Sequence, residues 1–212
     1  MKNKSTRLAR EISLLSLIIC LVSFLGMGQT AIQKELTTQE RFAKLEHKLI
    51  YPFLKGSKMT GVVPVDFATN VVEKNQGMKL IFDFTQGTAA DLQSTNINPG
   101  LEEVIRVLNL HVAAGIEKKK LKVIIIFHSA SLMSLLNDAY YQAKYGVNNP
   151  NSDIIKQLHA ANVEMVVCGQ SIHLRELKPD QFLSEMAFAI SAKTTLSKYQ
   201  NLGYILFAIA GH

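Results

Sequence analysis

The sequence has few cysteines and few prolines, and each shortage excludes a class of protein. It has two cysteines, Cys20 and Cys168, and only five prolines among 212 residues. The two cysteines form no Cys-x-x-Cys pair, which excludes a thioredoxin-like dithiol mechanism. The low proline count, together with 48% hydrophobic residues, excludes a low-complexity chain and indicates a globular protein with one sizeable core.

Several motifs that mark large enzyme classes are also missing. No Gly-x-Gly-x-x-Gly segment follows the first expected strand and there is no Walker lysine loop, so the sequence does not support nucleotide binding. The Gly-x-Ser-x-Gly segment of α/β-hydrolases is absent too. No repeat at the periods of solenoid proteins is present.

The charge gives no support for a nucleic-acid partner. The net charge is +6, and half of it lies in residues 1–28, where four basic residues outnumber one acidic residue. A run of lysines at 118–122 directly precedes an apolar segment, and no aromatic residues are interleaved with it. We therefore interpret this run as a solvated loop and expect no nucleic-acid binding.

The N-terminus has the three parts of a secretory signal peptide. Basic residues up to Arg10 precede an apolar stretch from Ile12 to Phe24, and small residues follow at Gly26 and Gly28. We expect a signal peptide over residues 1–28, cleavage near Gly28 to Thr30, and export to the periplasm or cell envelope. The apolar stretch is shorter than the roughly 20 residues of a spanning helix, so we expect no membrane span in the mature chain. An uncleaved anchor is the alternative.

Cleavage of this segment would change the cysteine count. Cys20 would be removed and Cys168 would be the only cysteine of the mature chain. An intrachain disulfide would then be impossible. An unpaired cysteine in an exported protein is buried, paired between chains, or a working thiol.

The remaining chain divides into an N-terminal helix and arm, residues 29–77, and an α/β domain, residues 78–212. In the arm, Thr37 and Glu40 form a capping box that opens a helix, which Tyr51-Pro52 stops. In the domain, apolar runs predict strands that alternate with amphipathic helical segments. This alternation predicts a parallel sheet with helices on both faces. The expected strands are 79–84, 121–127, 163–167, 186–190 and 204–209.

Three side chains that can take part in chemistry stand at the ends of expected strands: Asp83, His128 and Cys168. If the strands are neighbours, these side chains converge in one crevice at the carboxyl edge of the sheet. A thiol that precedes a helix is stabilised as thiolate, and a hydrogen bond from His128 would lower its pKa further.

Each of these residues also has a purely structural interpretation. Cys168 could be a small buried hydrophobic residue and His128 a hydrogen-bonded strand-end histidine. For Asp83 we favour a structural role, as a cap for a loop or helix. A metal site is a third interpretation, although the three residues lack the spacing of a known metal motif.

Several segments, taken together, resemble the DsrE/DsrF-like sulfur-relay family over about residues 78–210. They are Cys168-Gly169-Gln170-Ser171 after an apolar strand, Asn98-Pro99-Gly100-Leu101-Glu102, Phe127-His128 followed by 131–136, 145–151, and Ser191 with Gly203-Tyr204. The resemblance implies a three-layer α/β/α domain with a mostly parallel sheet of about five strands in flavodoxin-like topology. It also implies assembly into trimers or hexamers. We expect no cofactor.

In cytoplasmic members of that family, a cysteine at this place carries sulfur as a persulfide between donor and acceptor proteins. The matching residue here is Cys168, and the resemblance makes His128, Asp83, Gly169, Gln170 and Ser171 candidate supporting residues. Two departures stand out: the N-terminus of this chain has the pattern of an export signal, and Ser129 occupies a position that is often glycine. We expect an exported sulfur carrier, rather than a turnover enzyme, that uses Cys168. The alternative is a non-catalytic binding or assembly domain in which this cysteine is structural.

Overall fold

The computed structural model describes residues 37–73, 76–93 and 95–211. The expected signal peptide and its cleavage site lie outside the described residues. Two compact units are distinguished, residues 1–44 and residues 45–212. Within the described residues, none of the helices combines the length and the apolar character needed to cross a membrane.

Helix α2 (Thr38–Leu45) begins at the predicted capping box. The backbone N–H of Thr37 donates to Glu40 Oε2 at 2.7 Å, and the backbone N–H of Glu40 donates to Thr37 Oγ1 at 3.2 Å. The helix ends earlier than the predicted stop at Tyr51-Pro52. A single 3₁₀ turn, η1 (Glu46–Lys48), follows it, and Leu49 is then extended.

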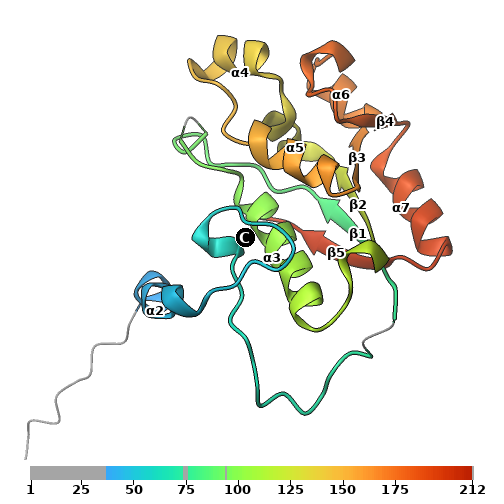
Figure 1. The fold of residues 1–212 in the computed structure, drawn as a ribbon. Coiled ribbons are helices and arrows are strands. Elements are labelled where there is room, and N and C mark those ends of the chain that lie inside the picture. The colour runs from blue at the N-terminus through green and yellow to red at the C-terminus, as the bar shows by residue number, and fades with distance from the viewer. Residues whose placement is uncertain (1–36, 74–75, 94, 212) are drawn as a thin grey trace, which may run out of the picture. The chain divides into compact units, whose positions relative to one another are not determined.

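The domain is built on one parallel sheet (Figure 1). Its strands are β1 (Met78–Phe84), β2 (Leu121–Phe127), β3 (Val163–Cys168), β4 (Ala187–Ala189) and β5 (Ile205–Ile209), in the spatial order β4-β3-β2-β1-β5. The central strands read as nearly continuous apolar runs because both of their faces are covered. This accounts for the strand prediction at 79–84 and 121–127.

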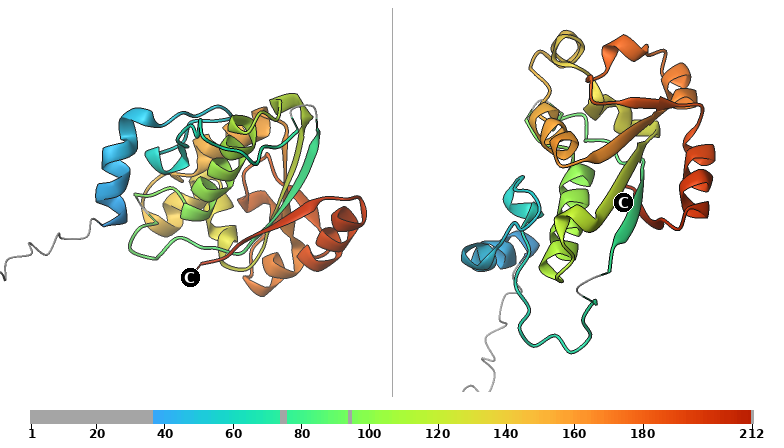
Figure 2. Two further views of the ribbon diagram at one scale, coloured as in Figure 1. Left: turned by 90° about the horizontal axis from the view of Figure 1, so that it is seen from below. Right: turned by 45° about the vertical axis from the view of Figure 1, so that its right-hand side comes forward.

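Helices cover both faces, which confirms the three-layer α/β/α architecture. Figure 2 shows α3 (Pro99–Ala113) and α5 (Ser152–Ala160) on one side of the sheet and α7 (Ala192–Asn201) on the other. Two separate apolar layers result. The layer under α3 and α5 contains Phe82, Phe84 and Phe127, and the layer under α7 contains Ile81, Ile126 and Cys168.

The strand order corrects one part of the expectation. A flavodoxin-like sheet has the order 2-1-3-4-5, whereas here the last strand, β5, lies beside β1. The reason is the connection through α7, which starts at β4 on one edge of the sheet and ends at β5 on the opposite edge. Local sequence patterns do not encode such a long crossover.

The segment after β2 is not the single helix that the apolar spacing predicts for residues 132–145. It is divided into a 3₁₀ helix, η4 (Ser129–Leu135), and α4 (Asp138–Tyr145). At the break, Leu136 is extended and forms a β-bridge with Phe182. Asn137 then caps α4 by accepting a hydrogen bond from the N–H of Tyr140 at 3.1 Å. A long-range contact therefore overrides the local helical pattern.

Buried asparagines hold the loops together at the carboxyl edge. Asn98 caps α3 and donates to the Gln86 carbonyl and to Ser134 Oγ at 2.9 and 2.8 Å. Asn151 accepts from the backbone N–H of Asn98 at 2.7 Å. Asn149 binds Asn151 in turn and donates to the carbonyls of residues 134 and 136. These motif residues therefore have a structural role: they fix the loops around the strand ends.

Residues 50–62 of the arm lie against α3. Ile50 and Val62 form an antiparallel bridge, and Asn109, fully buried within α3, binds the chain between them. The Asn109 side chain accepts from the N–H groups of Phe53 and Leu54 at 2.7 and 3.2 Å. It also donates to the carbonyls of Leu54 and Thr60 at 2.9 and 2.8 Å.

Candidate functional site

The strand register brings the three predicted side chains to one edge and one face of the sheet. Asp83 pairs with Ile126, and Ile126 pairs with Val166. His128 and Cys168 each follow two residues later on their own strands. Because side chains alternate between faces along a strand, Asp83, His128 and Cys168 all lie on the face covered by α7. The three side chains therefore converge at the carboxyl edge of the sheet, as expected from neighbouring strands.

His128 is hydrogen-bonded to Asp83. Its Nε2 atom lies 2.6 Å from Asp83 Oδ1, and both side chains are mostly buried, at 19% and 23% exposed. The backbone N–H of His128 donates to the Phe84 carbonyl at 3.0 Å, which continues the ladder beyond β2. Within the described part of the chain, His128 forms no hydrogen bond to the thiol. The Asp83 carboxylate binds the imidazole instead, so His128 is a hydrogen-bonded strand-end histidine and Asp83 is its partner rather than the cap of a loop or helix.

The thiol of Cys168 lies at the end of β3, where α6 (Gly169–Leu174) begins, and only 4% of the residue is exposed. Burial raises the pKa of the thiol. The Ser171 hydroxyl and the backbone N–H groups of Ser171, Ala192 and Gln170 oppose this effect by hydrogen bonding. The pKa is lowered overall. The site therefore favours thiolate in spite of its burial, because donors surround the sulfur.

One of these donors comes from a distant part of the chain. Ala192 is the first residue of α7, and Ser191 caps this helix by accepting from the N–H of Thr194 at 3.1 Å. The helix is fixed to the sheet by Leu196 and by Tyr199, whose hydroxyl donates to Glu164 Oε1 at 2.9 Å. The amino terminus of α7 thereby faces the thiol and adds its partial positive charge.

The contribution of Ala192 is not apparent from the sequence. Serine at position 191 is a typical helix cap, but the proximity of α7 to β3 follows only from the strand order. The pairing of Cys168 with Ala189 on β4 places the start of α7 next to the sulfur.

Gly169 allows two segments to approach each other closely at this point. A Cβ atom on Gly169 would lie 2.8 Å from the Ala189 carbonyl oxygen and 3.3 Å from that of Ile190. Gln170 also joins these two segments, because its Nε2 donates to the Ile190 carbonyl at 3.3 Å. These two residues thus position the segment that leads into α7.

Ser129 connects His128 to the thiol environment. Its φ is +59°, in the left-handed region that favours glycine. Its backbone N–H donates to Ser171 Oγ at 3.1 Å. A serine therefore adopts the conformation that glycine would supply, at a cost of about 1 kcal/mol. Such backbone strain is typical of functional sites.

The topology also favours a functional site here. The connections after β1 and β2 lead to α3 and α5 on one face, whereas the connection after β4 leads to α7 on the other. Cys168 ends the strand that lies between β2 and β4. Ligands in open α/β sheets bind at such a switch in connection direction, outside the carboxyl ends of the strands.

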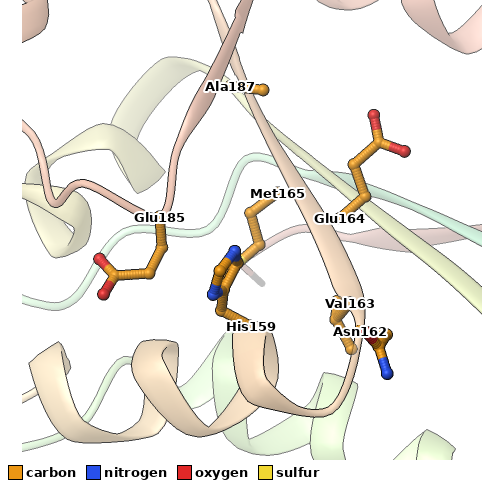
Figure 3. A pocket seen from close by; sticks show the side chains of 7 residues that line it. All are labelled: His159, Asn162, Val163, Glu164, Met165, Glu185 and Ala187. Carbon is orange, nitrogen blue, oxygen red and sulfur yellow. The ribbon is translucent and has the colours of Figure 1, made fainter.

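No metal centre is indicated in the described residues, since no three histidine, cysteine, aspartate or glutamate side chains are grouped to hold an ion. A separate cavity of about 380 Å³ lies at the amino end of β3, away from Cys168 (Figure 3). His159, Glu164 and Glu185 contribute to its lining. Because the cavity lies at the start of β3 and Cys168 is the last residue of this strand, the cavity is distinct from the thiol site.

Comparison with known proteins identifies the family. The model of the DsrE/DsrF-like family matches residues 79–208, more than half of the chain. The chain belongs to the DsrE/DsrF-like family. The match to the DsrE/DsrF-like family begins in β1, ends in β5, and includes Asp83, His128 and Cys168.

A solved structure with a similar arrangement is that of a protein of unknown function, MTH1491 from Methanobacterium thermoautotrophicum. It is 14% identical, with a TM-score of 0.47, and the alignment covers 62% of this chain and 98% of that one. Among curated proteins, none matches the sequence.

Proposed function

We propose that this DsrE/DsrF-like protein accepts and passes on sulfane sulfur through a persulfide on Cys168. The observation that supports this most directly is the donor set around the sulfur. Ser171 and the first residues of α6 and α7 lower the pKa of a thiol that burial alone would raise. Packing of a structural cysteine requires no such arrangement.

The chemistry follows from a stabilised thiolate. A thiolate attacks the outer sulfur of a persulfide, or either sulfur of a disulfide, and displaces the other sulfur, which leaves as a thiol once it is protonated. One thiol suffices for a carrier, because sulfur gained in one exchange is lost in the next. Membership of a sulfur-relay family supports the same role.

Access to the thiol requires a local opening, since Cys168 is only 4% exposed. The side chain of Gln170 is exposed and spans from α6 to the Ile190 carbonyl, beside the thiol. Breaking this one 3.3 Å hydrogen bond would free the Gln170 side chain from the segment that leads into α7. We propose that a donor or acceptor protein does so on docking.

The place of action and the assembly complete the proposal. The N-terminal signal pattern supports export to the periplasm or cell envelope, and the family resemblance supports a trimer or hexamer. The donor and acceptor would then be envelope proteins or small persulfides outside the cytoplasm.

Intact-mass measurement tests the sulfur chemistry. The full chain is incubated with glutathione persulfide, and we expect a gain of one sulfur atom that is reversed by a thiol reductant. Replacement of Cys168 by serine should abolish the gain. The matched control, Cys20→Ser, should retain it. A gain that survives Cys168→Ser, or no gain in the unchanged protein, contradicts the proposal.

The second candidate is a binding or assembly domain with a structural cysteine, which the low exposure of Cys168 favours. Alkylation of the native protein as a function of pH separates the two candidates. A working thiolate should titrate below the reference pKa of about 8.5. A structural thiol in an apolar layer should titrate above it.

A further inference from the structure

The Asp83–His128 pair has a feature that thiolate stabilisation does not use. Asp83 is bound to Nε2 of the imidazole at 2.6 Å. Within the described residues, the other ring nitrogen, Nδ1, has no hydrogen-bond partner. An imidazole held by a carboxylate through one nitrogen can take up and release a proton at the other.

The position of this pair relative to the sulfur is fixed by the sheet. Phe127 pairs with Val167, so His128 and Cys168 occupy the next positions on adjacent parallel strands. Neighbouring strands lie about 4.8 Å apart, and both side chains are on the face under α7. A donor molecule whose outer sulfur reaches Cys168 can therefore place its leaving sulfur within reach of the imidazole.

The β4 side offers little room. There Ala189 pairs directly with Cys168, and the backbone N–H of Ala192 is hydrogen-bonded to the sulfur. On the opposite side, the His128 side chain is 19% exposed. The His128 side is therefore the more open of the two.

We propose that His128, oriented by Asp83, carries the proton of the sulfur-transfer step that the proposed function requires. Cys168 reacts as the thiolate that its α6 and α7 donors stabilise, and Nδ1 takes up the proton that the thiol releases to water. The thiolate attacks the outer sulfur of a persulfide, R–S–SH. The bond between the two donor sulfurs breaks and its electron pair leaves with R–S⁻. A new sulfur–sulfur bond forms at Cys168, and the imidazolium returns the proton to give R–SH.

This step is balanced without an oxidant or a reductant. One sulfur–sulfur bond is broken and one is formed, and the proton released by Cys168 ends on the departing thiol. Asp83 does not touch the reacting atoms. It is a positioning residue that holds Nε2 and stabilises the transient imidazolium.

The dependence of the rate on the leaving group tests this role. Variants are made in a Cys20→Ser background, so that Cys168 alone reacts. Disulfide exchange is measured with oxidised glutathione, which releases an alkyl thiol of pKa about 8.5, and with bis(nitrobenzoate) disulfide, which releases a better leaving group. The ratio of the two rate constants cancels the thiolate fraction, because both reagents use the same thiolate.

The variants should slow the reaction with oxidised glutathione more than the reaction with the aromatic disulfide. His128→Gln keeps an amide near the Asp83 carboxylate but lacks Nδ1, and it should slow the glutathione reaction at least about tenfold. The aromatic disulfide does not need its leaving sulfur protonated, so its reaction should slow less than about threefold. Asp83→Asn should shift the same ratio in the same direction. His159→Gln, an exposed histidine on α5, is the matched control and should leave the ratio unchanged.

An equal loss with both disulfides, or no loss with either, overturns the role of His128. An unchanged ratio in Asp83→Asn overturns the positioning role of Asp83. These outcomes are separate from the persulfide test, since disulfide exchange needs no sulfane sulfur. If the unchanged protein gains no sulfur from glutathione persulfide while the selective loss is seen, only the proposed function fails.

Discussion

The backbone N–H of Ser129 donates a hydrogen bond of 3.1 Å to the hydroxyl oxygen of Ser171. This oxygen is thereby occupied as an acceptor, and the hydroxyl hydrogen is left to be donated to the Cys168 sulfur. Ser129 itself adopts the left-handed conformation, with φ +59°. The loop after β2 thus contacts the hydroxyl that lowers the pKa of the thiol on β3.

The first prediction concerns this hydroxyl. Ser171→Ala removes one of the groups that lower the thiol pKa, while the burial that raises it remains. The pKa of Cys168 should therefore rise, and the midpoint of alkylation against pH should move to higher pH. Iodoacetamide kinetics in a Cys20→Ser background measure this midpoint.

Ser197→Ala, on the exposed side of α7, is the matched control for this experiment. Its midpoint should equal that of the unchanged protein. A midpoint that stays in place or falls in Ser171→Ala would mean that Ser171 does not act on the sulfur.

The second prediction concerns the close approach at Gly169. In Gly169→Ala, the new methyl group would lie 2.8 Å from the Ala189 carbonyl oxygen, so the backbone must shift. The free energy of unfolding should fall by about 1–3 kcal/mol. The shift moves the start of α7 away from the sulfur, so the alkylation midpoint should also rise.

Urea unfolding and alkylation of the same samples measure both effects. Gly77→Ala is the control, because a Cβ atom there would lie 3.5 Å from the Lys120 carbonyl oxygen, an ordinary contact. It should change the free energy of unfolding by less than about 0.5 kcal/mol. Loss of stability without a rise in the midpoint would show that Ala192 contributes nothing to the thiolate.

Much of the fold follows from the sequence because its signals are local. The apolar runs predict all five strands to within a residue or two, and Ser191 predicts the start of α7. Asparagine is one of the residues that end helices in the left-handed conformation, and Asn162 after α5 has φ +60°. The break at Leu136 and the position of β5 were not predictable, because each depends on contacts with segments far along the chain.

The candidate site could likewise be predicted from the sequence only in part. The parallel-sheet prediction brings Asp83, His128 and Cys168 to one edge, since parallel strands end together. Which of these side chains hydrogen-bond to one another depends on the strand order and on the face of the sheet from which each side chain projects. Asp83 lies on β1 and reaches across to His128 after β2, and the donors to Cys168 come from α6 and α7. No spacing in the sequence contains that information.

The third prediction concerns Asn109, which holds the arm on α3. Asn109→Ala leaves two N–H groups and two carbonyl groups of residues 53–60 without their partner. These groups can regain hydrogen bonds to water only if the arm detaches. We expect the free energy of unfolding to fall by about 1–3 kcal/mol and the arm to open locally before the sheet unfolds.

Hydrogen exchange resolved by segment measures this opening. Amides of residues 50–62 should exchange much faster in Asn109→Ala, whereas those of β1 and β2 should stay protected. Asn201→Ala, at the exposed end of α7, is the control and should alter neither segment. Unchanged protection of the arm in Asn109→Ala would mean that apolar contacts alone hold it. Asn109 lies on α3, far from the thiol on β3. The alkylation midpoint of Cys168 should therefore not move in Asn109→Ala. This result would separate the attachment of the arm from the chemistry of the site.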